Sequence, residues 1–351
     1  MDAVTLDLIG ERVDRLITID VRGRGRECPI MERLYPAARE IAGRPITAAA
    51  ASRLRDSLGP GDTVLLVTGM ACYGLAMETD GPLGALSLGR ALQVGLGARP
   101  IVLTHQLFAE RLVSASTSAG FFVAPWDQIA DVWGRLPSAL LVEGFPTDED
   151  AAAEKARLLL DQFRPKALIA IEARGPNREG QYHVVDGKNM TSLEAKFASL
   201  FTLAEKDGIL TIGIFDGCGH EIGFGTIAHA VEADYPRYRE CTCGCRSGMH
   251  DATRVDIPLP AATSNWGAYG IEACLSALLE NDAILHTTEQ DSRMLRACAD
   301  AGAIDGLTGR AELSVDGLPE KVQVSVLAIL HAIVQGALKG YTPGMRVTQS
   351  Q

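Results

Sequence analysis

The sequence has no apolar run that approaches the roughly 20 residues a membrane-spanning helix requires. Its first stretch, MDAVTLDLIGERVDRL, has neither a basic start with an apolar core nor an acid-poor amphipathic character. Basic residues are also in deficit, with 33 lysines and arginines against 44 acidic residues and a net charge of −11. Such a surface repels phosphate backbones. We therefore expect a soluble, cytoplasmic protein without a membrane or nucleic-acid partner, and we leave a homo-oligomer open.

Several binding motifs are missing as well. The glycines around residue 81 do not form G-x-G-x-x-G, and no lysine with serine or threonine follows them, so we expect no nucleotide cofactor. No G-x-S-x-G nucleophile elbow occurs. The eight cysteines lack the dense spacing of a small secreted domain, so reduced thiols are expected. Among them only Cys218, between two glycines, has the setting of a nucleophile, which makes it a candidate catalytic residue.

What the 351 residues do contain is an alternation of short apolar runs and helical patterns. This alternation predicts an α/β fold: a mostly parallel sheet with helices on both faces, a Rossmann-like three-layer arrangement. We expect residues 1–60 to be a helical segment packed on a main domain of residues 61–351. The expected strands are 62–68, 100–104, 139–143, 167–171, 209–215, 255–259 and 283–285. The expected helices are 34–42, 48–58, 83–96, 151–163, 192–207, 226–233, 264–279 and 320–338.

Acidic residues follow three of these strands. Glu78 and Asp80 come after the first, Glu172 ends the fourth, and Asp216 and Glu221 follow the fifth within the glycine-rich stretch TIGIFDGCGHEIGFG. Because carboxyl ends of parallel strands meet at one edge of a sheet, we expect these acids to surround one pocket. The alternative is that they are solvated on separate loops, with the first two only favouring the start of a helix.

Gathered carboxylates repel one another unless a cation lies among them or one keeps a proton. We therefore predict a divalent metal, magnesium or manganese, with Asp216, Glu221, Glu78 and Asp80 as candidate ligands. The adjacent His220 favours manganese.

A second candidate metal site lies in CTCGCRSGMHD, which contains Cys241, Cys243, Cys245 and His250. Three alternate thiols and an imidazole could bind zinc or iron. The spacing is not the C-x-x-C pair of a zinc ribbon, so a half-buried strand or loop is the alternative.

Two regions offer positive charge for an anionic small-molecule substrate. The loop VRGRGRECP contains Arg22, Arg24 and Arg26, which could bind an anion or a partner subunit, or could be solvated. Arg174 lies just after the acid that ends the fourth strand, so it is a second candidate for substrate binding.

Ser264 and Asn265 precede a helix, which they could cap, and the same helix start could cradle an anion. Near the end of the chain, DGLTGR and SVDGLP form two Asp-Gly turns. These are ordinary connections or they bring Thr308, Arg310 and Asp316 to the mouth of the pocket. Arg310 is thereby a further candidate for substrate binding.

Taken together, several of these motifs resemble the D-glutamate cyclase family, in particular the domain that forms the C-terminal part of the mitochondrial enzyme and stands alone in many bacterial proteins. The resemblance covers about residues 62–319. The motifs that carry it are ETDGPLGA (78–85), IEARGPNREGQYH (171–183), FDGCGHEIGFG (215–225), SNWGAY (264–269), DGLTGR and SVDGLP.

The resemblance implies cyclisation of D-glutamate to 5-oxo-D-proline with loss of water. Such a reaction needs a deprotonated amine, a polarised γ-carboxylate and an acid for the departing oxygen. From residue chemistry, Glu172 and His220 are candidate proton carriers. Arg174, Ser264 and Asn265 are candidates for holding the substrate carboxylates.

The chain also departs from the family pattern. Where the family usually reads aspartate-glycine-glycine-asparagine-glutamate, the segment 216–221 has one extra residue and places His220 where the asparagine is expected. After Glu172 the order is Ala-Arg-Gly-Pro, whereas the family tends to arginine-proline-glycine. The alternative functions are therefore a hydrolase that opens a small lactam, imide or other cyclic amide, and a non-catalytic small-molecule sensor.

Overall fold

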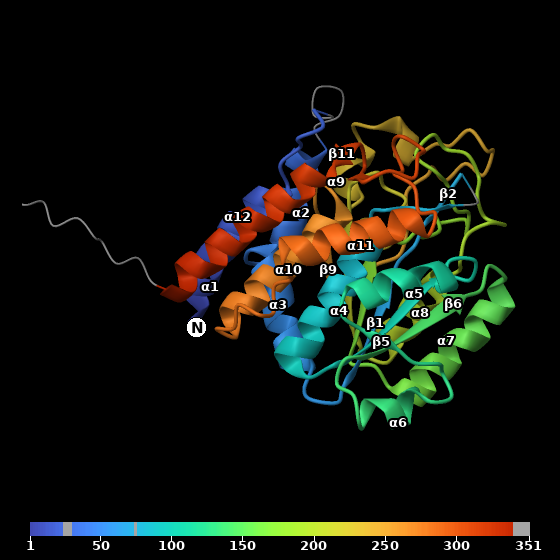
Figure 1. The fold of residues 1–351 in the computed structure, drawn as a ribbon. Helices are drawn as coiled ribbons and strands as arrows, with labels where there is room; N and C mark the ends of the chain where they lie inside the picture. Colours follow the sequence, from blue (N-terminus) through green and yellow to red (C-terminus); the bar gives the residue numbers. More distant parts are fainter. Residues whose placement is uncertain (24–29, 74–75, 340–351) are drawn as a thin grey trace, which may run out of the picture.

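The computed structural model describes residues 1–23, 30–73 and 76–339. Their centre is a seven-stranded sheet in which every pairing is parallel (Figure 1). Across the sheet the strands are β5 (Phe122–Val123), β6 (Ala139–Phe145), β4 (Arg99–His105), β1 (Thr63–Val67), β7 (Ala167–Ile171), β8 (Leu210–Phe215) and β9 (Ile257–Pro260). The predicted α/β fold with a parallel sheet is confirmed.

The direction in which the chain adds strands reverses at β1. The next long strands, β4 and β6, lie on one side of β1, whereas β7, β8 and β9 follow on the other. A crevice opens outside the carboxyl ends of the strands at such a reversal, because the two connections leave in opposite directions. Ligands of doubly wound folds bind in this crevice, so the β1–β7 edge is where a site is expected.

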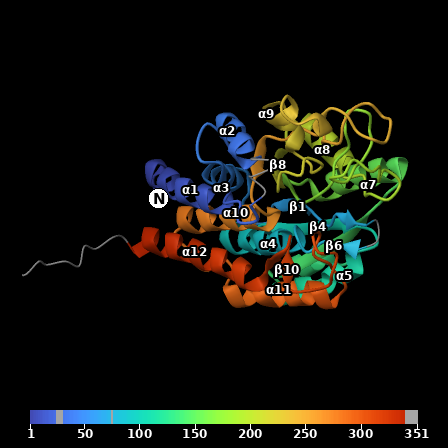
Figure 2. The same cartoon turned by 90° about the horizontal axis from the view of Figure 1, so that it is seen from above.

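Helices cover both faces of the sheet (Figure 2). On one face α4 (Pro82–Leu96), α5 (Ala109–Ser118), α10 (Ser264–Leu278), α11 (Thr288–Asp300) and α12 (Glu320–Lys339) share a single hydrophobic cluster. On the other, α6 (Ile129–Trp133), α7 (Glu149–Phe163) and α8 (Ala198–Lys206) form a second. In β1, Val64 and Leu66 join the first cluster while Leu65 and Val67 join the second. Both faces of the strand are thus buried, which is why it reads as a continuous apolar run.

The amino-terminal helices share the first cluster. They are α1 (Ala3–Ile17), α2 (Met31–Ala42) and α3 (Ile46–Ser57), and they pack against α10 and β9. Asp14 of α1 accepts hydrogen bonds from the backbone N–H groups of Ile46 and Thr47 at 2.7 and 3.1 Å, so α1 satisfies the first turn of α3. The core is continuous across residue 60, and the domain boundary there stays a prediction.

A buried polar network joins α10 to α11. His286 lies between Glu272, 2.7 Å away, and Asp291, 3.4 Å away, and Tyr269 donates a hydrogen bond to Asp291 at 2.5 Å. All four side chains are fully buried.

The structure corrects three predicted elements. Residues 283–285 form a turn instead of a strand, and Ile284 and Leu285 are apolar because they pack into the core. The predicted helix 192–207 begins only at Ala198, since the preceding residues form turns. The predicted helix 226–233 is reduced to α9 (His229–Glu232) after a 3-10 turn at Phe224–Thr226. Two short ribbons, β2 (Ala71–Cys72) with β3 (Ala76–Met77) and β10 (Ser314–Val315) with β11 (Leu318–Pro319), were not predicted.

Among the described residues, α12 is the one helix whose length and composition would allow it to cross a membrane. Core helices of soluble proteins pass the same test, and α12 packs against α1, α10 and α11. Only 28% of its most apolar window is buried, so an oligomer contact on its outer face stays a prediction.

Candidate functional site

A cavity of about 490 Å³ lies at the carboxyl edge of the sheet, where the strand order reverses. Its walls come from the loops after β1, β7 and β8, from the amino-terminal segment and from the turns near the end of the chain. The lining residues are Arg22, Met70, Cys72, Tyr73, Glu78, Glu172, Arg174, Val184, Val185, Asp186, Lys188, Met190, Asp216, Cys218, His220, Gly306, Leu307 and Asp316. A second hollow of about 430 Å³ lies at the amino ends of β7, β8 and β9 and contains none of the predicted site residues.

Three residues on the cavity wall have a left-handed backbone. Tyr73, Glu172 and Asp316 have φ values of +51°, +48° and +51°. Such values are uncommon for residues other than glycine and cluster at functional sites, where the surrounding structure holds them in place. Glu172 takes this conformation directly after β7 ends, and it lines the cavity.

The glycine-rich loop after β8 brings Asp216 and Glu221 together. A Cβ atom on Gly213 would lie 2.5 Å from the carbonyl oxygen of Ile222, so the loop can fold back onto the strand only because glycine is there. The backbone N–H of Cys218 donates both to Asp216 Oδ1 at 3.0 Å and to Glu221 Oε1 at 3.1 Å. One amide thus holds the two carboxylates side by side.

Asp251 holds this loop from outside and was missed in the sequence. Its carboxylate accepts hydrogen bonds from the N–H groups of Gly223 and Thr253, both at 3.0 Å, and its own N–H donates to Gly219 O at 2.7 Å. Burial raises the pKa of Asp251 to about 7. Nothing in the local sequence distinguishes it, because the two loop residues that it holds, Gly219 and Gly223, lie about thirty residues earlier.

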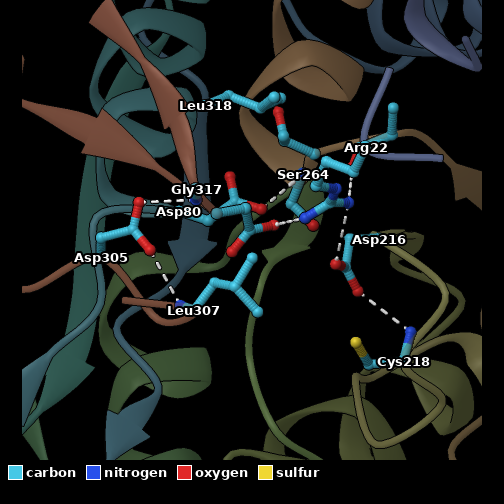
Figure 3. A network of polar contacts seen from close by, with 12 residues as sticks. Arg22, Asp80, Asp216, Cys218, Ser264, Asp305, Leu307, Gly317 and Leu318 are labelled. Carbon is cyan, nitrogen blue, oxygen red and sulfur yellow. Dashed lines mark hydrogen bonds and ion pairs between the residues drawn. The ribbon is translucent and has the colours of Figure 1, made fainter. Parts of the chain in front are cut away.

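Arg22 supplies positive charge to the acidic cavity (Figure 3). Its guanidinium lies 2.5 Å from Asp316 and 3.4 Å from Asp216, and it also donates to the carbonyl of Ala262. Asp316 therefore does reach the cavity, as one of the sequence alternatives expected. Arg24 and Arg26 lie outside the described residues.

The start of α10 already holds a carboxyl group, which is the chain's own Asp80. The backbone N–H groups of Ser264 and Asn265 donate to the two oxygens of Asp80 at 2.8 and 2.9 Å. The predicted caps are wrong, because Thr263 is the N-cap and its hydroxyl accepts from Trp266 N–H. The helix start is the anion cradle that the sequence predicted, but a side chain of the protein occupies it.

Ser264 and Asn265 point their side chains to different partners. The hydroxyl of Ser264 donates to Glu172 at 2.5 Å, so it orients a cavity carboxyl group. The side-chain oxygen of Asn265 accepts from the N–H groups of Gly81 and Gly84 at 2.9 and 2.8 Å. Asn265 thus fixes the loop that carries Asp80.

The predicted acids are buried, so the alternative of solvated acids on separate loops is wrong. Each of the five has at most 7% of its surface exposed. Burial, reinforced by neighbouring carboxylates such as Asp216 and Asp316, raises the pKa well above its usual value in Glu78, Asp80, Glu172 and Glu221. The cluster is thus relieved both by protonation and by the guanidinium of Arg22.

His220 lies in the same cavity with its pKa displaced in the other direction. Burial and the nearby Arg174 lower it well below the usual value for histidine. The Nε2 atom lies 3.2 Å from the sulfur of Met70, while Nδ1 is buried without a partner among the described residues. Since buried polar atoms are nearly always paired, an unpaired ring nitrogen in a cavity is a candidate contact for a ligand.

Two sets of ligand atoms at the cavity wall lie within 4.8 Å of one another: Glu172, His220 and Glu221, and Asp216, Cys218 and Glu221, of which the fully buried Glu221 lies behind the lining residues. Either set could hold a metal ion. Glu78 and Asp80, also predicted as ligands, belong to neither set. Glu78 instead accepts a hydrogen bond at Oε2 from the thiol of Cys72, with a distance of 3.2 Å between sulfur and oxygen.

The two predicted arginines of the substrate site differ. Arg174 lines the cavity and forms a buried ion pair with Glu194, and its Nε has no partner among the described residues. Arg310 is exposed and does not line the cavity.

A third group of possible metal ligands lies outside the cavity and corrects a predicted residue. His183, Cys241, Cys243 and Cys245 have ligand atoms within 4.8 Å of one another. Burial alone would raise the pKa of Cys241, but hydrogen bonds from Cys245 and Cys243 lower it to about 6. The predicted His250 is not part of the group.

His250 is held elsewhere because its Nε2 lies 2.7 Å from Glu232 and its Nδ1 lies 2.6 Å from the carbonyl oxygen of Asp251.

Comparison with known proteins agrees with the resemblance seen in the motifs. The family described as "D-glutamate cyclase-like, C-terminal" matches residues 13–331, from α1 to α12. This range extends the resemblance beyond residues 62–319 and takes in most of the amino-terminal helices, including the segment that carries Arg22. No curated protein matches the chain. The chain belongs to the D-glutamate cyclase-like, C-terminal family.

Proposed function

We propose that the chain is a lyase that cyclises D-glutamate, or a related amino dicarboxylate, to a five-membered lactam with loss of water. The family supports a cyclase-like enzyme, and the cavity supports this chemistry at the carboxyl edge of the sheet. The substrate and the reaction are the parts of the proposal that need an experiment.

The reaction makes one bond and breaks another. The amine nitrogen attacks the γ-carboxyl carbon, a C–N bond forms, and a C–O bond breaks. An ammonium group begins with three protons and the lactam nitrogen keeps one, so two protons leave with the oxygen as water. Two protons therefore move from nitrogen to oxygen. A base accepts the first proton from nitrogen while an acid donates one to oxygen, and the second nitrogen proton then returns to the acid as the base releases its own to oxygen, so both groups are restored.

The observation that carries the proposal is a pair of groups with opposite pKa displacements. His220 has a lowered pKa and is neutral at pH 7, so it can accept the proton of the ammonium group. Glu172 has a raised pKa and keeps its proton, so it can donate to the departing oxygen. Their ligand atoms lie within 4.8 Å of each other in one cavity, and groups displaced in this way are the usual acid and base of an active site.

The substrate carboxylates need positive groups among these acids. The unpaired Nε of Arg174 is a buried donor on the cavity wall, and Lys188 lies at the exposed rim. In the proposal Arg174 binds one carboxylate and Lys188 attracts the other. Ser264 and Asn265 act indirectly, through Glu172 and the loop of Asp80. The exposed Arg310 has no role.

Asp216 and Glu221 would hold a divalent metal. Two carboxylate ligands suit Mg²⁺ or Mn²⁺, and Glu221 would lose its proton when the ion binds. The ion would polarise the γ-carboxyl group. Glu78 and Asp80 remain outside this ligand set.

One assay tests both the reaction and its main alternative. The purified protein is incubated with D-glutamate, and separately with a panel of lactams and cyclic imides, with Mg²⁺, Mn²⁺ or no metal, and products are followed by NMR. We expect 5-oxoproline from D-glutamate. The thiol of Cys218 on the same wall favours a second candidate, a hydrolase of cyclic amides. Opening of a lactam without formation of 5-oxoproline would select that candidate.

Absence of any turnover, combined with a ligand that raises the melting temperature, would instead select the sensor.

The metal assignment has its own test. Glu221→Ala should abolish Mn²⁺ binding measured by calorimetry, whereas Asp150→Ala, at an exposed acid on α7, should leave it unchanged. Equal binding by both variants would remove Glu221 from the site.

A further inference from the structure

The group formed by His183, Cys241, Cys243 and Cys245 lies between two irregular segments, and in the part of the chain that the structure describes no strand pairing joins them. One segment runs from β7 to α8 and contains a tight turn in which Val184 N–H donates to Lys188 O at 3.0 Å. His183 precedes this turn and is fully buried. The other segment contains Cys241, Cys243 and Cys245, between the 3-10 turn Pro236–Tyr238 and β9.

Four side-chain atoms meet at the contact between these segments. The sulfur of Cys241 lies 3.1 Å from that of Cys243 and 3.0 Å from that of Cys245. Nε2 of His183 lies 3.1 Å from Cys243 Sγ and 3.8 Å from Cys245 Sγ. Around a tetrahedral ion, zinc bonds of about 2.3 Å to sulfur and 2.0 Å to nitrogen would place the sulfurs about 3.8 Å apart and the nitrogen about 3.5 Å from each sulfur. The thiols would therefore have to separate by less than about 1 Å to bind the ion.

No disulfide competes for these thiols, since all three are free and a disulfide would require a separation of about 2.05 Å. The surroundings also suit bound thiolates. The side-chain amide of Asn177 donates to Cys245 Sγ at 3.2 Å and to Gly248 O at 2.7 Å, so a hydrogen bond orients one candidate ligand. The His183 ring faces the sulfurs through Nε2. Its other nitrogen, Nδ1, has no partner among the described residues.

We propose that His183, Cys241, Cys243 and Cys245 bind one structural Zn²⁺ ion that fastens the 182–190 segment to the 241–245 segment. Four protein ligands leave no open position, which is the arrangement of structural and not catalytic zinc sites. The site is separate from the carboxylate cavity and does not depend on the proposed reaction.

The position of the site suggests that the ion stabilises the wall of the carboxylate cavity. The segment that carries His183 also supplies Val184, Val185, Asp186, Lys188 and Met190 to the cavity wall. This segment has few backbone pairings of its own beyond the turn and a bridge between His183 and Asn189. Zinc bound outside the cavity would therefore fix the position of the segment 184–190, which forms one wall of the cavity.

The test is zinc content per chain of the purified full-length protein, measured by plasma mass spectrometry after dialysis without chelator. We expect one zinc ion in the parent and a loss of most of it in His183→Gln. The matched control is His250→Gln, which changes the histidine that the sequence suggested but the fold pairs with Glu232. Cys72→Ser, at a thiol outside the group, should also keep its zinc.

A measurement on the parent protein covers the case in which His183→Gln fails to fold. X-ray absorption at the zinc edge should give three sulfur neighbours at about 2.3 Å and one nitrogen. Zinc that is surrounded only by oxygen and nitrogen would place the ion in the carboxylate cavity and overturn the proposal. So would a parent protein that contains no zinc and takes up none, or equal zinc in His183→Gln and the parent.

Discussion

His220 and His286 are both fully enclosed by the fold, with at most 5% of their surface exposed, and both lie next to carboxyl groups. Burial by itself would lower the pKa of either ring. At His220 the nearby Arg174 adds to this effect, and the pKa falls well below its usual value. At His286 the carboxylates of Glu272 and Asp291 outweigh burial and raise the pKa to about 9.

The difference between the two sites is a difference in pairing. The protonated His286 contacts a carboxylate through each ring nitrogen, so its charge is used to join α10 to α11. His220 has no partner for Nδ1 among the described residues, and one of its ring nitrogens lies within 4.8 Å of a carboxyl oxygen of Glu172, whose pKa burial raises well above its usual value. Charged neighbours, more than depth of burial, thus separate a structural histidine from a candidate catalytic one. Four predictions test this comparison.

The largest expected effect is on turnover. Glu172→Gln and His220→Gln should each lower kcat for D-glutamate cyclisation by about 10²–10⁴-fold, because each removes a group that transfers a proton. Steady-state kinetics followed by NMR measures this loss. The control is Arg310→Gln at an exposed residue outside the cavity, whose kcat should equal that of the parent. A kcat within twofold of the parent in either cavity variant would contradict the assigned roles.

The next effect is on stability. His286→Gln should lower the free energy of unfolding by about 3–5 kcal/mol, because it leaves Glu272 and Asp291 buried without their cation. Urea unfolding followed by circular dichroism measures the change. Turnover per folded molecule should be unaffected, since the network lies away from the cavity lining. A stability equal to that of the parent would mean that this histidine is not charged.

The third effect is a pH dependence of stability. The folded pKa of His286, about 9, lies above its unfolded value of about 6.5. Its contribution is therefore complete below pH 6.5 and is lost as the pH rises through 9. We expect about 3 kcal/mol to disappear over this window. Urea unfolding at a series of pH values checks the loss, and His286→Gln should lack this component while other groups titrate as before.

The smallest effect tests the edge of the same network. Tyr269→Phe removes the hydroxyl that donates to Asp291 at 2.5 Å, and the free energy of unfolding should fall by about 1.5–3 kcal/mol. Thermal and urea unfolding measure the change. Its kcat should stay within twofold of the parent. A much larger loss of turnover would show that the network and the cavity act as one unit, and the comparison would fail.

Much of the fold is readable from the sequence because buried parallel strands are apolar along their whole length. Strand β7 was predicted with both ends correct, and β1 and β8 within one residue at each end. The same reasoning failed at Ile284 and Leu285, whose side chains are buried without any strand pairing. Apolar residues report burial, and only their pattern and length suggest the backbone conformation.

The site was predicted where a topological rule sufficed. Glu172, Asp216 and Glu221 follow strands of one parallel sheet, so their meeting at one edge needed no knowledge of long-range contacts. Arg22 lies 194 residues from Asp216, and the amides that bind Asp80 lie 184 and 185 residues from it. No local pattern predicts contacts at such separations.

The sequence by itself determined the parallel sheet, the acidic edge and the family, because each depends on local runs of residues or on short motifs in order. Only the tertiary structure decided which side chains share an environment. It placed Asp80 at the start of α10, Arg22 among the carboxyl groups, and His183 instead of His250 beside the three thiols. Protonation, pairing and metal binding depend on distances of a few ångström in space, and these are set by packing between segments that are remote in the chain.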